Sequence, residues 1–316
     1  MERGSKTYKT FEVTGVELEL MVVDCDTLRV SPIVDALFED LANTNASEVT
    51  LGKVVMSKAP ACHVVKLKIT KSTKRFAGAR KEFNRRIREI DAVLAKHNAM
   101  LLPTATHPFT DPNAEVVIRT LDGNELQALY DRYFGSRTHG WRNGQNTFLN
   151  LPFANDSEFS KLHAAIRLLL PIIPALSASS PFLGGKTTGF LDSRMEAYLH
   201  SLDEVPTLMG PFIPEALFSE EDYYRTIFSP IAKALAELEV GTTVDHHAAN
   251  ARAAVARFDR GTIEVRVIDG QECPTADLAI AELIVAVLKA LTTGRWVSTY
   301  LQRAWNEHDL LPLFLQ

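Results

Sequence analysis

The sequence contains little cysteine. Its three cysteines, Cys25, Cys62 and Cys273, are far apart in a chain of 316 residues. Disulfide frameworks and zinc sites need more cysteines at closer spacings, so neither is indicated. The first residues also lack the apolar core of a signal peptide. These two absences lead us to expect a reducing, cytoplasmic setting.

Long apolar runs are also absent. The most apolar windows are 168–176, which contains two prolines, and 278–291, which contains a glutamate and a lysine. A membrane-spanning helix needs roughly 20 mostly apolar residues. We therefore expect no membrane partner.

The chain has no excess of positive charge, since its formal net charge is −5. The most basic segment is 71–90. Its apolar residues recur at helical spacing, which predicts an amphipathic helix with a solvated basic face. Binding to a nucleic-acid duplex usually requires a basic surface, so nucleic acid is not expected as a partner.

Two acids interrupt the apolar stretch "TGVELELMVVD" at residues 14–24. In a strand, Glu17 and Glu19 point to one face while Val16, Leu18 and Leu20 point to the other. The apolar side is predicted to face the core. The acids are either solvated glutamates on a half-exposed strand or a pair of oxygen ligands for a divalent cation such as Mg²⁺.

Three other segments alternate in the same way. In "RGTIEVRVID" (260–269), Glu264 and Arg266 share a face, as a simple ion pair or as parts of a metal–phosphate site. In "ACHVVKLKIT" (61–70), Lys66 shares a face with Lys68, and in "NTFLNLPF" (146–153) Phe148 shares one with Asn150. The doublet His246–His247 is predicted to lie in a surface loop.

The overall pattern predicts an α+β fold in one domain spanning 1–316. Clean alternation favours an antiparallel sheet with helices on one face and a polar surface on the other. The expected strands are 11–23, 62–70, 146–152 and 261–269. The expected helices are 75–98, 158–178, 220–238 and 276–292.

Three long segments, 14–32, 142–199 and 256–291, carry a resemblance to a known family. Together they resemble the glutamate–cysteine ligase type 2, or carboxylate–amine ligase, family, in the same order from about residue 11 to 295. The resemblance implies a glutamine-synthetase-like fold, in which a curved, mainly antiparallel sheet forms a funnel with helices packed outside. It also implies ATP and Mg²⁺ as cofactors, and amide formation from a carboxylate and an amine through an acyl phosphate.

The resemblance suggests a role for several residues. It makes Glu17, Glu19 and Glu264 metal ligands, and it makes Arg266 a catalytic phosphate contact. Nucleotide or substrate contacts are implied for four further residues: Asn150, Arg194, Arg252 and Arg257. Among these, Arg194 is expected to clamp an anion.

Three positions depart from the family pattern. Ala59 and Lys66 stand where the family has acids, and Phe148 stands where it has a histidine. These residues cannot ligate a metal, so at least one metal position is expected to be lost. The acids Glu17, Glu19 and Glu264 are predicted to face three bases, Lys66, Lys68 and Arg266.

Two functions remain open on the sequence alone. One is an active ATP-dependent ligase with a rebuilt site, which joins a small-molecule carboxylate to an amine. In that site Lys66 takes a catalytic role, because it contacts phosphate in place of one metal ion. The other is an inactive pseudoenzyme that acts as a binding or partner subunit, in a homo-oligomer or with an active paralogue.

Overall fold

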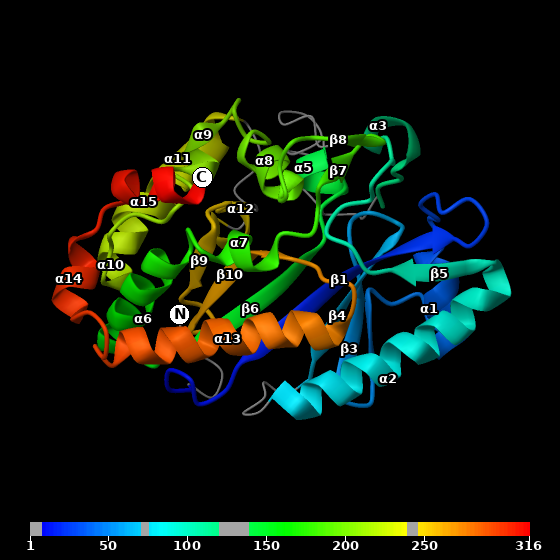
Figure 1. The fold of residues 1–316 in the computed structure, drawn as a ribbon, viewed down its shortest axis with the longest axis horizontal. Helices are drawn as coiled ribbons and strands as arrows, with labels where there is room; N and C mark the ends of the chain where they lie inside the picture. The colour runs from blue at the N-terminus through cyan, green and yellow to red at the C-terminus, as the bar shows by residue number, and fades with distance from the viewer. Residues whose placement is uncertain (1–7, 71–75, 120–138, 239–245) are drawn as a thin grey trace.

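The computed structural model describes residues 8–70, 76–119, 139–238 and 246–316 (Figure 1). Its main feature is an eight-stranded sheet in the order β2-β3-β4-β1-β6-β10-β9, with β5 paired to β1. Every strand pairing in this sheet is antiparallel. The predicted α+β class with a mainly antiparallel sheet is therefore confirmed.

The strands of the large sheet are short to medium in length. They are β1 (Gly15–Asp24), β2 (Glu48–Leu51), β3 (Val54–Lys58), β4 (Val64–Ile69), β5 (Ala99–Leu102), β6 (Asn146–Pro152), β9 (Ala254–Arg257) and β10 (Thr262–Asp269). A separate two-stranded hairpin contains β7 (Phe182–Leu183) and β8 (Lys186–Thr187).

Helices gather on one face of the sheet and at its ends. The longer ones are α1 (Val34–Ala42), α2 (Phe76–Leu94), α6 (Asp156–Leu169), α11 (Ser229–Glu237), α13 (Pro274–Thr292) and α15 (Glu307–Phe314). The shorter ones are α3 (Pro112–Glu115), α5 (His139–Arg142), α7 (Ile173–Ser177), α8 (Ser193–Leu199), α9 (Pro206–Met209), α10 (Glu220–Tyr223), α12 (His246–Ala249) and α14 (Thr299–Ala304). In Figure 1, α2 and α13 cross in front of the strands.

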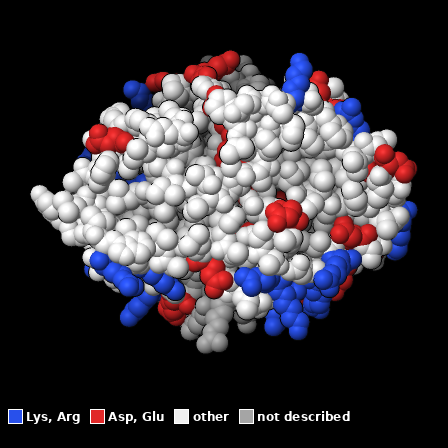
Figure 2. Space-filling model, viewed as in Figure 1, with Lys and Arg blue, Asp and Glu red and all other residues white. Residues whose placement is uncertain are grey.

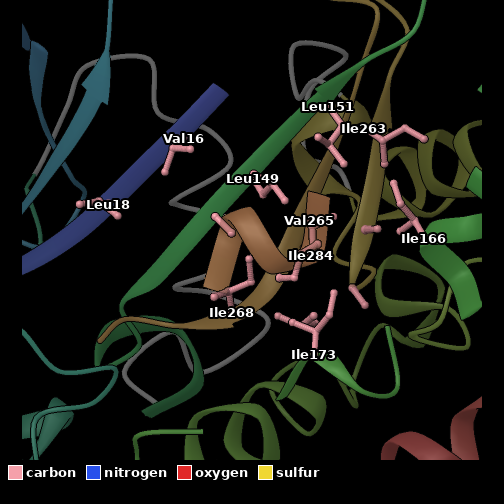
Figure 3. Packing of buried hydrophobic residues seen from close by; sticks show 14 of the residues in the cluster. Val16, Leu18, Leu149, Leu151, Ile166, Ile173, Ile263, Val265, Ile268 and Ile284 are labelled. Carbon is pink, nitrogen blue, oxygen red and sulfur yellow. The ribbon is translucent and has the colours of Figure 1, made fainter. Parts of the chain in front are cut away.

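The core lies between the sheet and these helices (Figure 3). Val16 and Leu18 of β1, together with Leu149 of β6, are at most 2% exposed. They belong to one cluster with Ile166 of α6 and Ile284 of α13. Burial of this apolar face provides the main driving force for folding. Because strand side chains alternate, it also directs the intervening polar side chains to the opposite face.

Helix α2 confirms the predicted amphipathic pattern of the basic segment from residue 76 onward, and residues 71–75 of that segment lie outside the described ranges. Phe76, Phe83 and Leu94 are buried against the core. Figure 2 shows Lys and Arg side chains gathered along the lower edge of this view, where α2 and α13 lie. Arg85 of α2 is about half exposed and pairs with Glu82 one turn earlier. The basic face is therefore solvated and partly neutralised within the helix.

Two predicted helices are divided in the structure. The expected helix 158–178 becomes α6 and α7, because Pro171 lies between them and proline lacks the N–H that an α-helix interior needs. The expected helix 220–238 becomes α10, a π-helical turn at Tyr224–Phe228, and α11. The doublet His246–His247 was predicted to lie in a loop, which is wrong, because both residues belong to α12.

Candidate functional site

A cavity of about 430 Å³ opens on the polar face of the large sheet. Six residues from the polar faces of the predicted strands line this cavity: Glu17, Glu19, Lys66, Phe148, Glu264 and Arg266. The predicted meeting of the three acids with Lys66 and Arg266 is confirmed. The residues come from four adjacent strands, β4, β1, β6 and β10.

Strand register explains why these side chains meet. In an antiparallel sheet, residues directly opposite each other point to the same face and lie about 5 Å apart. The opposed pairs on the cavity side are Glu19 with Lys66, Glu17 with Lys68 and Phe148, and Glu264 with Asn150. A shift of one residue in any pairing would have sent its partner to the core face.

Lys66 lies at the centre of the acidic pair. Its Nζ is 2.8 Å from Glu19 Oε1 and 3.6 Å from Glu17 Oε1. The same atom lies 5.3 Å from the centre of the Phe148 ring. Burial alone would lower the pKa of Lys66, but the two carboxylates outweigh it and raise that pKa above its ordinary value. Lys66 is therefore cationic at neutral pH.

The two acids near the centre differ in their surroundings. Burial raises the pKa of Glu17, and the nearby Lys66 only partly offsets that effect. Burial would likewise raise the pKa of Glu264, yet Arg266 lowers it below the ordinary value. Arg266 Nε donates to Glu264 Oε1 at 2.8 Å, and its Nη1 donates to the Asn250 carbonyl at 2.7 Å. Each of these acids thus has a basic neighbour.

Arg194 lies in the cavity wall, as expected for an anion clamp, but it is already engaged. It is 3% exposed. Its Nε donates to Asp269 of β10, and its Nη1 donates to the Asn146 side chain. Asn146 in turn donates from its backbone N–H to Glu19 at 3.1 Å. Arg194 is thereby connected to Glu19 through Asn146.

The other three predicted contacts do not line the cavity. Arg252 donates from Nε and Nη2 to Glu215 at 2.7 and 2.6 Å, and Arg257 donates to Asp259 at 3.1 and 2.9 Å. Asn150 is on the polar face of β6 opposite Glu264 but is not among the lining residues. Their proposed contacts with nucleotide or substrate remain predictions.

The residues present do not fit a magnesium site. Ala59 and Phe148 line the cavity without offering a ligand atom, and the Lys66 ammonium lies beside Glu19 and Glu17. Within the described ranges, no three His, Cys, Asp or Glu side chains are grouped so that they could hold a metal ion. Mg²⁺ is usually held through one or two carboxylates together with waters and phosphates, and here the carboxylates of Glu19 and Glu17 contact an ammonium instead.

Reasoning from the sequence missed several cavity residues. Arg142 of α5 and Arg260, at the turn before β10, both line the cavity, as does Tyr198 of α8. No local pattern distinguishes these residues, because they reach the cavity through folding of distant segments. Their effect is electrostatic, since five cationic and three acidic side chains of the described residues line the cavity.

An antiparallel sheet whose acids and arginines surround one cavity suits ligands that carry phosphate or carboxylate groups. Residues 13–313 match the model of the Glutamate-cysteine ligase family 2. The chain belongs to this family, which confirms the resemblance seen in its sequence. The family is of the carboxylate–amine ligase type.

Relatives are found in archaea and bacteria. An "Uncharacterized protein" of Archaeoglobus fulgidus is 31% identical over 276 residues, which are 87% of this chain and 74% of that protein. A "Putative glutamate--cysteine ligase 2" of Cronobacter sakazakii is 27% identical over 86% of this chain and 66% of its own length. A protein of the same name from Bradyrhizobium sp. (strain ORS 278) is 27% identical over 67% of this chain and 48% of its own length. This chain thus spans about half to two thirds of these two named relatives.

Two solved structures are similar over almost the whole chain. One is described as a "novel glutamine synthase homolog", with a TM-score of 0.40, 11% identity, and coverage of 96% of this chain and 60% of that one. The other is a complex of the "Prokaryotic Ubiquitin-like Protein Pup and its Ligase PafA", with a TM-score of 0.43, 9% identity, and coverage of 98% and 51%. Across the part of this chain that the structure describes, every helix is too short or too polar to cross a membrane.

Proposed function

We propose that this chain binds an anionic small molecule in the sheet cavity and no longer carries out magnesium-dependent ATP chemistry. One observation supports the proposal above all others. The acids that would hold the metal are paired with bases of the same chain, Glu19 and Glu17 with Lys66 and Glu264 with Arg266.

The electrostatic cost of adding a metal is large. Two unit charges 4 Å apart interact by about 4 kcal/mol at an effective dielectric constant near 20, so a divalent ion at that distance from Lys66 would be repelled by about 8 kcal/mol. Lys66 could move aside, but it would then give up its 2.8 Å contact with Glu19. A metal must therefore compete with a cation that the fold already supplies.

The cavity offers several basic groups to an anion. Five of its described lining residues are cationic and three are acidic, although Arg194 is already paired with Asp269 and Arg260 with Asp259 behind the wall. Arginine guanidinium groups bind carboxylates and phosphates through paired hydrogen bonds, and ammonium groups bind them as point charges. Under this proposal the protein is a pseudoenzyme that acts as a binding or partner subunit, either in a homo-oligomer or beside an active relative.

An active ligase is the second candidate, and the accessibility of two bases favours it. The side chains of Lys66 and Arg266 remain 27% and 18% exposed in the cavity, so a phosphate group can reach both. In this alternative, ATP would phosphorylate a small carboxylate and an amine would displace the phosphate to form an amide. Arg266 and Lys66 would neutralise the negative charge that develops on the transferred group.

Calorimetric titration with ATP, in EDTA and in excess Mg²⁺, separates the two candidates. We expect binding of similar affinity in both buffers and no release of ADP when a mixture of amino acids is added as carboxylates and amines. Binding that requires Mg²⁺, together with ADP release, would establish the active ligase. If ATP, pyrophosphate and glutamate all fail to bind, the proposed function is wrong.

A further inference from the structure

We propose that Lys66 is a built-in cation that anchors an oxyanion of the ligand, that Phe148 holds it in place, and that binding is therefore independent of divalent metals. The inference rests on the proposed function, because it concerns the same cavity. It adds that Lys66 Nζ contacts the negatively charged oxygen of a phosphate or carboxylate ligand, and that Phe148 keeps this atom in position.

The surroundings of the Lys66 ammonium leave room for a ligand. An ammonium group has three N–H donors. The Glu19 carboxylate accepts at 2.8 Å, whereas the Glu17 carboxylate is farther away, at 3.6 Å. The Lys66 side chain lines the cavity and keeps 27% of its surface exposed. A ligand oxygen can therefore approach the ammonium from the open side of the cavity.

Phe148 limits where the ammonium can go. It lies on β6 directly opposite Glu17, and its ring centre is 5.3 Å from Lys66 Nζ. A cation is attracted to the face of an aromatic ring at this distance. The ring cannot donate or accept a conventional hydrogen bond, so it positions the ammonium without using up its N–H groups.

The acids keep Lys66 charged and in place. Glu19 Oε1 lies 2.8 Å from Lys66 Nζ and Glu17 Oε1 lies 3.6 Å from it, so both carboxylates attract the ammonium to this position. Lys66 also belongs to a central strand of the sheet, β4, which lies between β1 and β3. A fixed positive charge of this kind can neutralise the negative charge of an oxyanion, as a metal ion does in a metal-dependent site.

Lys68 offers a matched comparison. It follows Lys66 by two residues on the same strand and the same face. It is exposed, however, and it is not among the residues that line the cavity. Removal of the Lys68 charge lowers the net charge of this face by one, as removal of the Lys66 charge does, but it removes no direct contact with a ligand.

The test is titration of the full chain with ATP, pyrophosphate and inorganic phosphate, in EDTA and in excess Mg²⁺. We expect Lys66→Met to weaken binding of at least one of these anions by about tenfold or more, as expected for loss of a charge-assisted contact. Lys66→Arg should retain most of the affinity. Lys68→Met should leave affinity within about twofold.

Phe148→Leu tests the positioning role. It should weaken binding by a few-fold in the wild-type background and have no further effect when Lys66 is already methionine, because the ring acts through the ammonium. If Lys66→Met alone does not fold, the double variant Lys66→Met, Glu19→Gln removes the unpaired acid and should fold, yet still bind weakly.

The outcomes separate this inference from the proposed function. Anion binding that requires Mg²⁺, or that is unchanged in Lys66→Met, overturns the role of Lys66 and leaves an anion-binding cavity. Additive effects of Phe148→Leu and Lys66→Met overturn the positioning role of the ring. If the wild-type chain binds none of ATP, pyrophosphate and inorganic phosphate, the role of Lys66 as a phosphate anchor is overturned, and if glutamate also fails to bind, the proposed function is overturned as well.

Discussion

Arg194 of α8 donates from Nε to the carboxylate of Asp269 at the end of β10, and both side chains are almost fully buried. Asp269 also accepts hydrogen bonds from the Ser179 backbone N–H at 2.9 Å and the Ser180 hydroxyl at 2.8 Å. This pair joins a helix, a strand and the segment after α7 at the cavity wall. Arg194 therefore has a structural role whether or not it also contacts a ligand.

Replacement of Asp269 should destabilise the protein strongly. Asp269→Ala leaves the buried Arg194 guanidinium without its acid, which typically costs about 3–5 kcal/mol. Denaturation by urea measures the change. Asp259→Ala is the control, because Asp259 is 38% exposed and its pairing with Arg257 lies nearer the surface, so its loss should cost about 1 kcal/mol or less. Equal losses in the two variants would contradict the importance of the buried pair.

Arg266 should contribute more to anion binding than Lys68. Arg266 lines the cavity, whereas Lys68 lies on the same face outside it. We expect Arg266→Ala to weaken ATP or pyrophosphate binding by about tenfold or more, and Lys68→Ala by about twofold or less. Calorimetric titration of both variants measures the difference. Similar affinities for the two would count against a phosphate contact by Arg266.

A metal site should be recoverable at the cavity. Ala59, Lys66 and Phe148 all line it, so Ala59→Glu, Lys66→Glu and Phe148→His together would add two carboxylates and an imidazole and remove the ammonium. Because these are ligand types that Mn²⁺ accepts, the triple variant should bind Mn²⁺ more tightly than the wild type.

Titration with Mn²⁺ and thermal melts with and without the metal measure this gain. Lys68→Glu is the control, since it adds an acid on the same strand outside the cavity and should bind Mn²⁺ as weakly as the wild type. Tight Mn²⁺ binding by the wild-type chain, unchanged in the triple variant, would rule out a degenerate metal site and favour an active, rearranged ligase.

The buried carboxyl of Asp277 should make stability depend on pH. Burial raises its pKa from 3.8 to about 6, although the Thr147 hydroxyl and the Gln271 N–H both donate to it. A raised pKa means that the folded state binds the proton more tightly. The resulting stabilisation is present at low pH and is lost as the pH rises through about 6.

Asp277→Asn removes this dependence. The free energy of unfolding of the variant, relative to the wild type, should rise by about 1 kcal/mol between pH 5 and pH 7.5. Urea denaturation at both pH values measures it, with Asp203→Asn as a control at an exposed position. A difference between variant and wild type that does not change with pH would show that Asp277 titrates normally.

The sequence by itself determined which face of each long strand is polar. Alternation is a local property with a period of two residues, so Glu17 could be placed on the same face as Glu19, and Glu264 on the same face as Arg266, before any pairing was known. That the polar faces of different strands belong to one surface was implied only by the family resemblance. It also identified strand β6 at its observed bounds and strands β4 and β10 to within two residues. The short strands β2, β3, β5 and β9 were missed, because strands of four or five residues give a weak periodic signal.

Only the tertiary structure decided which charges meet. Glu19 and Lys66 are opposite each other because of the register between β1 and β4, and Arg194 binds Asp269, 75 positions away in the sequence. Arg142 and Arg260 likewise reach the cavity from segments without a local motif. The state of the acids depends on burial and on neighbouring charges within a few ångströms, and those distances are set by long-range packing. The sequence could therefore predict that Lys66 faces the acids of its neighbouring strands, but only the fold shows that its ammonium lies beside both Glu17 and Glu19.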